Sequence, residues 1–586
     1  MKLTPLSKIL ITLSVVTLIV LIGSQFKDTL APPSQNKVST NVPPKADLPG
    51  VGDALPAATE KPPGCANLPE VRFYHWAWNA QSGLMLATGG KQAVADSAMC
   101  KNGVNLKLIR EDNVDTMQSL MLTFAEKSKA GEGNPAEGAH FVAIMGDGSA
   151  SFLKGLNDRL AKLGPDYLAI VVGSAGYSRG EDKFMGPPEW KADPQKSRGG
   201  LVAGYLRDGD WNIALKWLGD NQIPNNPDDT TWDPDALNWV NASDYIDAGQ
   251  KYVSNFCTDL KNTKTGAMEN HCVNGVVTWT PGDVTVAEGR GGLVSIVSTK
   301  EYRSQMPNVI IGNKKWMAAN PEIVKGMLRA IFEGGDRIKK DDAALREAAA
   351  ISALVYNEKD AAYWYKYFRV VEEKDKQGLV VELGGSSVNN LADNLELFGL
   401  ASGSVNAFAA TYTVFANIVK SQYPDLMPDY WPVAQILDTS YLQALAKEGA
   451  PTTVADMASF EPEAKVEQVV SRRTWDIQFD SGKATFTPAA TATLNQLKDD
   501  LVIASGTLVE LHGHTDNQGS ADKNQQLSED RAFAVKQWLT AQSSTNFPAN
   551  RIKVFAHGAS EPIESNSSPA GRATNRRVEV VMGTSK

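Results

Sequence analysis

The feature that most constrains the fold of this chain is a regular exchange of strand and helix periodicity from Trp475 to the C-terminus. Apolar residues alternate in a segment that begins at Trp475 and again over 507–514, 551–556 and 577–582, which is typical of strands with one buried face. Residues 489–501 and 529–540 carry apolar side chains at helical spacing. The pattern predicts an α/β sandwich over residues 471–586.

Three motif blocks lie within this segment in order. They read H-G-H-T-D-N-Q-G-S at 512–520, N-Q-Q-L-S-E-D-R-A at 524–532 and G-R-A-T-N-R-R-V-E-V at 571–580. Together they resemble the OmpA-like peptidoglycan-binding domain, which also occurs in flagellar-motor stator proteins and peptidoglycan-associated lipoproteins. The resemblance covers about one fifth of the chain and implies non-covalent binding of the diaminopimelate residue of the cell-wall peptide, with peptidoglycan as the partner.

The resemblance also assigns contact residues. The T-D pair falls on Thr515 and Asp516, the second block supplies Asn524 and Arg531, and the closing block supplies Arg576, although strand alternation leaves open which arginine of that block faces the ligand. The free end of diaminopimelate is a zwitterion, so one acid beside one guanidinium suits it, and arginine can grip a carboxylate through two charge-assisted hydrogen bonds. The alternative is a purely structural ion pair between Asp516 and Arg531.

His512 and His514 lie two residues apart and therefore on one face of a strand. We expect no metal there, because no third ligand follows at metal-site spacing, and we expect no cofactor.

The N-terminal segment carries a membrane signal. The apolar run Ile9–Gly23 follows Lys2 and Lys8, with no acidic residue before it. Either a transmembrane signal-anchor helix over 1–26 or a cleaved secretory signal fits this pattern. Poor residues at the cleavage positions favour the anchor, which predicts a single-pass inner-membrane protein with its bulk in the periplasm; cleavage would leave it periplasmic. Residues 27–65 read as a Pro-rich linker.

Residues 66–446 alternate strand and helix patterns, which predicts two α/β lobes with parallel sheets. V-N-G-V-V-T-W-T-P-G-D at 273–283 and the segment 308–330 resemble solute-binding proteins of the nitrate, sulfonate and taurine type, with the type II periplasmic binding fold. A second linker is expected over 447–470. The whole chain is therefore expected to be an α/β multidomain protein.

Ligands of open α/β sheets bind at the carboxyl ends of strands. The candidate ligand residues in the loops there are Trp76, Asn79, Asp147, Ser149, Ser174 and Trp279. The alternative is that the tryptophans are core or lobe-interface aromatics and that Asp147 or Ser149 caps a helix. Asp208 and Asp210 stand where relatives that bind anions carry small or hydroxyl residues, and carboxylates there disfavour an anionic ligand.

The four cysteines suit an oxidising compartment. Cys257 and Cys272 bracket a short insert and are expected to form a disulfide, and Cys65 and Cys100 are candidates for a second one. The alternative is four free thiols.

Charge excludes one class of partner. The chain has 67 acidic and 58 basic residues, so we expect no nucleic acid. The acidic surplus lies between residues 71 and 470, with 50 acidic against 39 basic residues. We expect a cell-envelope protein, not an enzyme, that anchors to peptidoglycan and holds a binding module near the inner membrane. The alternatives are a receptor for a small solute, anionic or sulfonate-like, that serves an ABC-type transporter or sensor partner, and an enzyme acting on wall material.

Overall fold

A computed structural model describes residue 55 and residues 58–206, 209–449 and 452–585. All of these residues belong to one compact unit of the chain. The expected membrane anchor over 1–26 lies outside the described residues. Within the described ranges, no helix combines the length and the apolar character needed to span a bilayer.

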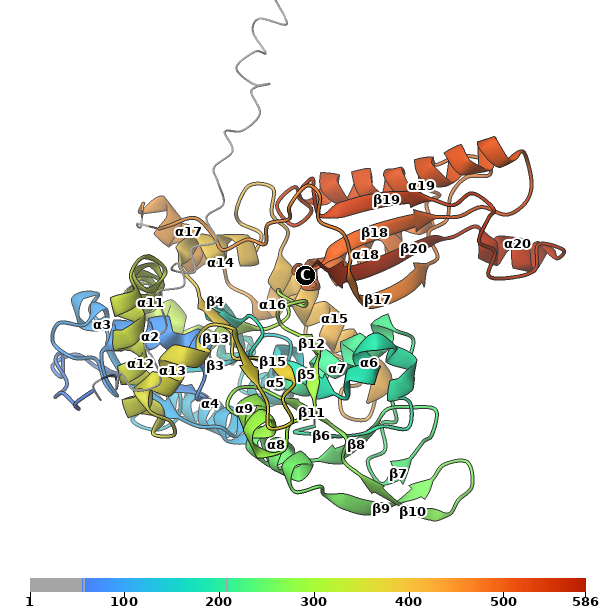
Figure 1. Ribbon diagram of the computed structural model, residues 1–586. Coiled ribbons are helices and arrows are strands. Elements are labelled where there is room, and N and C mark those ends of the chain that lie inside the picture. The colour runs from blue at the N-terminus through green and yellow to red at the C-terminus, as the bar shows by residue number, and fades with distance from the viewer. Residues whose placement is uncertain (1–54, 56–57, 207–208, 450–451, 586) are drawn as a thin grey trace, which may run out of the picture. The chain divides into compact units, whose positions relative to one another are not determined.

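The first lobe is built on a six-stranded sheet with the strand order β16-β4-β13-β3-β1-β2 (Figure 1). Its strands run along β1 Glu70–His75, β2 Asn105–Arg110, β3 Phe141–Met145, β4 Ala169–Ser178, β13 Pro307–Asn313 and β16 Ser386–Val388.

Helices cover this sheet, and apolar side chains pack between the helices and the strands. The helices are α2 Ser82–Thr88, α3 Ala98–Lys101, α4 Val114–Lys129, α5 Ser149–Leu160, α10 Lys314–Ala319, α11 Pro321–Lys340, α12 Asp342–Tyr356, α13 Ala361–Tyr367, α14 Leu391–Leu397, α15 Ala407–Gln422, α16 Val433–Ile436 and α17 Ser440–Lys447. Helices α2 and α11 approach very closely, since a Cβ on Gly334 would lie 2.2 Å from the carbonyl oxygen of Gly83. Glycine is therefore required at this crossing.

The second lobe contains a five-stranded sheet with the order β12-β5-β11-β6-β8. Its elements are β5 Lys183–Gly186, α6 Pro188–Ala192, β6 Leu201–Gly204, α7 Gly209–Asp220, β8 Asn238–Asn241, α8 Tyr245–Val253, β11 Gly275–Thr278, α9 Gly282–Gly289 and β12 Val294–Ser298. A three-stranded sheet of β7 Thr231–Trp232, β9 Cys257–Asn262 and β10 Met268–Cys272 and the hairpin of β14 Val371–Lys374 and β15 Val380–Leu383 complete the two-lobed region.

The expectation of parallel sheets is only partly correct. Strands β1, β2 and β3 pair in parallel, as do β6, β8 and β11. However, β13 runs antiparallel to β3 and β4, and β5 runs antiparallel to β11 and β12. The chain enters the second lobe through the crossover 179–182 between β4 and β5 and returns through 299–306 between β12 and β13. The entering strand β5 and the returning strand β13 thus reverse direction, and so does β16, which runs antiparallel to β4.

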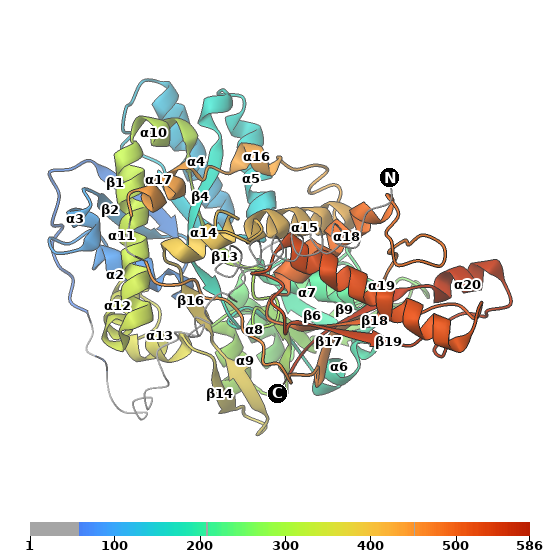
Figure 2. The same ribbon diagram turned by 90° about the horizontal axis from the view of Figure 1, so that it is seen from above.

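The C-terminal domain is a four-stranded sheet with the order β17-β20-β18-β19. It contains β17 Gln468–Trp475, α18 Ala490–Ile503, β18 Leu508–Gly513, α19 Ala521–Gln542, β19 Ile552–Ala556, α20 Pro569–Asn575 and β20 Val578–Thr584. Helix α18 packs against α15 of the two-lobed region, and the two lie side by side in Figure 2.

Two sequence predictions in this domain are wrong in detail. The first strand was expected to begin at Trp475, but β17 ends there and starts at Gln468, inside the expected linker. It pairs antiparallel with β20, so its partner is distant in the sequence. Helix α19 begins at Ala521, eight residues before the expected start, because the side chain of Ser520 accepts a hydrogen bond from the Lys523 N–H and caps the helix.

Both predicted disulfides are present. Cys65 pairs with Cys100, with Cα atoms 5.6 Å apart, and Cys257 pairs with Cys272. The second bridge closes the β9–β10 hairpin, where the two cysteines are direct register partners.

Candidate functional site

The predicted wall-binding residues surround the loop that follows β18. The Asn524 Nδ2 donates a hydrogen bond to the Asp516 carbonyl oxygen at 3.1 Å, and the Gln518 N–H donates to Asp516 Oδ1 at 3.0 Å. These two bonds fix both the backbone and the carboxylate of Asp516, which is 8% exposed. The Thr515 hydroxyl is buried, and it has no hydrogen-bond partner among the described residues.

One guanidinium group pairs with the carboxylate, and a second lies near enough to interact with it electrostatically. Arg576 Nη1 lies 2.6 Å from Asp516 Oδ2, and its side chain is 44% exposed. Arg531 lies on the same face of α19 as Asn524, seven residues further along the helix. It is 6% exposed and donates from Nε to the Lys483 carbonyl oxygen at 3.1 Å. Burial, followed by the nearby positive charge of Arg576, lowers the pKa of Arg531, and Asp516 opposes this shift. An additional negative group beside Arg531 would therefore be favourable.

The structure also distinguishes the two arginines that end the third motif block. Arg577 is buried and donates from Nη1 to the Glu561 carbonyl oxygen, whereas Arg576 faces Asp516. Sequence analysis missed the contribution of the loop before α18. Its Lys483 carbonyl and the Phe479 ring, 5.1 Å from the Arg531 guanidinium carbon, hold Arg531 in place.

The arrangement brings one carboxylate and two guanidiniums together at a partly exposed position. Arg576 and Asp516 form an ion pair whose arginine is partly exposed. A zwitterionic ligand can replace this pair, since its ammonium group can bind the carboxylate and its carboxylate can bind the guanidinium groups. The Arg531 Nε bond to the backbone orients the rest of its guanidinium fork. The site is therefore suited to a small zwitterionic group.

The expectation of no metal at His512 and His514 rested on sequence spacing. In the fold two distant residues reach His514, because His557 and Glu561 come from the segment after β19, and the ligand atoms of these three residues lie within 4.8 Å of one another. However, the rings of His514 and His557 are stacked at 4.7 Å with planes 9° apart. The lone pairs of parallel stacked rings lie in separate planes and do not converge on one point, so we assign no metal.

Of the residues proposed for the two-lobed region, Trp76 and Trp279 come together. Trp76 follows β1 of the first lobe and Trp279 follows β11 of the second, and their rings are stacked at 6.1 Å. Both indoles are buried, and neither Nε1–H has an acceptor in the described ranges.

The other proposed residues have structural partners. Asp147 Oδ1 accepts from the Gly148 N–H and Oδ2 accepts from Gln305 Nε2 at 2.8 Å, and the Ser149 hydroxyl donates to the Gly146 carbonyl. Ser174 lies inside β4, where its hydroxyl donates to the Gly176 carbonyl. With its amide turned so that both polar atoms have partners, Asn79 donates a hydrogen bond to the Trp364 carbonyl oxygen and accepts one from the Phe368 N–H. Asp208 lies outside the described residues.

Sequence analysis missed two buried acids in the crossover between the lobes. Glu181 and Asp182 are fully buried. Trp78 Nε1 donates to Glu181 Oε2 at 3.0 Å, and Ser386 donates to the same oxygen. Burial raises the pKa of Glu181 well above its usual range, and burial also raises the pKa of Asp182. No sequence motif marks these residues, because two adjacent acidic residues are typical of an exposed turn.

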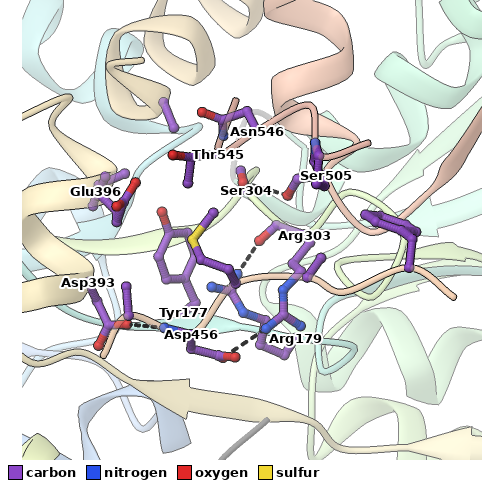
Figure 3. A pocket seen from close by; sticks show the side chains of 17 residues that line it. Tyr177, Arg179, Arg303, Ser304, Asp393, Glu396, Asp456, Ser505, Thr545 and Asn546 are labelled. Carbon is purple, nitrogen blue, oxygen red and sulfur yellow. Dashed lines mark hydrogen bonds and ion pairs between the residues drawn. The ribbon is translucent and has the colours of Figure 1, made fainter. Parts of the chain in front are cut away.

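A small pocket of ≈ 50 Å³ lies where both crossovers meet the C-terminal domain (Figure 3). Arg303 forms an ion pair with Asp456 at 2.8 Å, and Arg179 donates to the Arg303 carbonyl. The hydroxyl groups of Ser304 and Ser505 hydrogen-bond at 2.7 Å. This volume has room for a few waters only. We therefore assign no ligand to the pocket and regard it as a gap between packed elements.

The OmpA family profile matches residues 478–576. The chain is 41% identical over 116 residues to outer membrane porin F of Pseudomonas fluorescens, which covers 20% of this chain and 34% of that protein. It is 32% identical over 177 residues to the peptidoglycan-binding protein ArfA of Mycobacterium tuberculosis (29% and 51%). It is 34% identical over 140 residues to outer membrane protein A of Bordetella avium (24% and 69%).

The chain thus spans about a third to a half of the length of the first two relatives. A solved structure, the periplasmic nitrate-binding protein NrtA from Synechocystis PCC 6803, is 10% identical with a TM-score of 0.44, over 67% of this chain and 93% of that chain.

Proposed function

The chain belongs to the OmpA family through its C-terminal domain, and we propose that this domain anchors the protein non-covalently to peptidoglycan. The observation that carries the proposal is the cluster of Asp516, Arg531 and Arg576. The free end of diaminopimelate carries an ammonium beside a carboxylate. In the proposed complex Asp516 receives the ammonium, and the two guanidiniums receive the carboxylate through charge-assisted hydrogen bonds.

The hydrogen-bond geometry supports specific roles for the remaining residues. Asn524 holds the Asp516 backbone, so it positions the carboxylate. The buried Thr515 hydroxyl offers a further bond to the ligand. The relative ArfA is named as a peptidoglycan-binding protein, which agrees with this assignment.

The rest of the proposal concerns location. The proposed wall binding supports a location in the cell envelope. Residues 1–26 hold it in the inner membrane, and residues 27–62 serve as the arm to the two-lobed module, because Pro63, Gly64 and Cys65 are already bonded to the first lobe. The bulk of the chain lies in the periplasm.

A second function is supported by the two-lobed region. Two crossovers join the two lobes, and cavities lie between the loops at the carboxyl ends of their strands. This arrangement suits a receptor for a small solute. In this function the module captures a small solute and presents it to an inner-membrane transporter or sensor, while the wall domain fixes its position.

Co-sedimentation of the purified chain with diaminopimelate-containing sacculi tests the anchoring. Arg531→Ala should weaken binding by about tenfold to a hundredfold, since each hydrogen bond to a charged group contributes about 1.5–3 kcal/mol. Arg531→Lys should not restore it fully, because lysine lacks the planar fork.

The matched control is Lys523→Ala, which removes one positive charge from an exposed position of the same helix. Circular dichroism of each variant verifies the fold. Wild-type sedimentation of folded Arg531→Ala would refute the assigned site.

A further inference from the structure

The cleft between the two lobes has room for a small molecule. One cavity of ≈ 440 Å³ is lined by residues that follow β2 in the first lobe and β6, β8 and β11 in the second. A second cavity of ≈ 640 Å³ is lined by Trp76 and α5 of the first lobe and by the loops after β6 and β8. Tyr205 lines both cavities. Their sizes fall in the range of small-molecule sites.

The wall of the first cavity is aromatic. Tyr245 and Trp279 are stacked with ring centroids 3.8 Å apart and planes at 27°, and Trp76 of the opposite lobe extends the stack. The face of an aromatic ring carries partial negative charge, and it attracts ammonium groups within about 6 Å.

The charged lining is acidic in excess. The two cavities are lined by five acidic side chains, which are Glu111, Asp112, Asp115, Asp158 and Asp244, and by only two basic ones, Arg110 and Lys154. Asp112 and Asp158 are already bound by those two basic side chains.

Both basic groups are also occupied by further carboxylates. Arg110 lies 2.8 Å from Glu358, and Lys154 pairs with Asp429. Within the described part of the chain, Glu111, Asp115 and Asp244 have no cationic partner. The described lining therefore offers negative charge to a ligand and no uncommitted positive charge.

A separate observation points to a bound molecule. Trp76 lines the second cavity and Trp279 the first, and their Nε1–H groups are buried without an acceptor among the described residues. Leaving such donors unpaired costs free energy. A ligand oxygen would satisfy them, so the ligand carries a hydrogen-bond acceptor as well as a positive charge.

We propose that the interlobe cleft binds a small organic ammonium compound that also carries an oxygen acceptor, such as an amino alcohol or a betaine. The ammonium group lies against the face of Tyr245 that is turned away from Trp279, near Glu111 and Asp244, and the oxygen accepts from the indole N–H groups. The inference rests on the receptor function proposed above and is independent of wall binding.

Isothermal titration of the full chain tests it, with choline, ethanolamine and glycine betaine as probes. Sodium nitrate, sodium sulfate and sodium methanesulfonate at matched ionic strength are the anionic comparison. We expect saturable binding of at least one ammonium compound and none of the three anions. Binding of an anion alone, or of no probe at all, would overturn the proposal.

Two variants locate the site. Trp279→Leu should weaken binding of the ammonium probe at least tenfold. Trp232→Leu, a tryptophan of the same lobe that stacks on His271, is the control and should bind as wild type. Because Trp279 is buried, the double variant Glu111→Gln and Asp244→Asn provides a second test at more exposed positions, where asparagine can still cap α8.

The double variant should bind the ammonium probe about tenfold more weakly than wild type. Wild-type affinity in both the double variant and folded Trp279→Leu would contradict the proposed site. Sedimentation with sacculi, measured in parallel, should be unchanged in every cleft variant. Failure of ammonium binding with intact sedimentation would therefore refute the cleft ligand alone.

Discussion

At the residue scale, buried charge distinguishes the binding positions from the structural ones. Arg551 is fully buried, and its guanidinium donates to the carbonyl oxygens of Thr507, Asn546, Leu501 and Ala504. All of these acceptors are backbone atoms, so this arginine closes the end of α18 and is unavailable to a ligand. Arg531 uses Nε for a similar backbone bond and lies near enough to Asp516 for the carboxylate to oppose the lowering of its pKa. The motif block marks Arg531 in the sequence, whereas the structural role of Arg551 is visible only from its partners.

Glu396 yields a pH prediction at this scale. Burial, followed by the nearby Asp393, raises the pKa of Glu396 to about 7 from 4.5. A carboxyl with a raised folded-state pKa contributes stability that is complete below pH 4.5 and is lost as the pH rises through 7. Glu396→Gln should therefore be more stable than wild type at pH 8 by about 1–3 kcal/mol, a range that already allows for the partial exposure of this side chain. At pH 5 the two proteins should be nearly equally stable.

Urea unfolding of both proteins at the two pH values measures this difference. The same change in the free energy of unfolding at pH 5 and pH 8 would show that Glu396 does not titrate in this range.

At the element scale, the sequence predicts most strands and helices where one face is buried and the pattern is local. The segment 507–514 is observed as β18 at Leu508–Gly513, and the predicted helix over 489–501 is observed as α18 at Ala490–Ile503. The first strand of the C-terminal domain could not be placed, because its extent is set by pairing with β20, more than 100 residues later. The candidate contacts Asp516 and Arg531 followed from motif blocks, whereas Glu181, Phe479 and the cleft acids depend on chain segments that only folding brings together.

The β9–β10 hairpin carries an element-scale prediction. The Cys257–Cys272 bridge closes a loop with a sequence separation of 15. Replacing both cysteines by serine should lower the stability of this hairpin by about 3 kcal/mol through the greater chain entropy of the unfolded state. Hydrogen exchange of the β9 and β10 amides, compared with that of β18, measures the local loss. Unchanged exchange in β9 and β10 would contradict the prediction, and β18 should exchange as in wild type.

At the scale of the whole molecule, a buried charge network joins the second lobe to the C-terminal domain. Lys216 of α7 lies 2.7 Å from Asp500 of α18 and 3.1 Å from Asp220, and Tyr302 of the returning crossover donates to Asp220 at 2.6 Å. Burial raises the pKa of Asp220 to about 6 despite the opposing effect of Lys216. The network thus connects a helix that begins at the cleft, a crossover between the lobes and the wall-binding domain.

Removing the cation should weaken this connection. Lys216→Met leaves two buried carboxylates without their partner, which costs about 3–5 kcal/mol at pH 8 and less at pH 5, where Asp220 takes up a proton. Calorimetry should show a lower unfolding temperature than for Lys196→Met, an exposed lysine of the same lobe. Equal unfolding temperatures for the two variants would exclude a stabilising role for the network.

The central claim is that the C-terminal domain recognises the zwitterionic end of diaminopimelate. Lysine-type peptidoglycan carries the corresponding ammonium but lacks the adjacent carboxylate, so Arg531 and Arg576 have no group to bind there. The most direct measurement is therefore the affinity of the full chain for purified sacculi of the two types at equal ionic strength. We predict binding to diaminopimelate-type sacculi that is at least about tenfold tighter than to lysine-type sacculi. Equal affinity for both would contradict the claim.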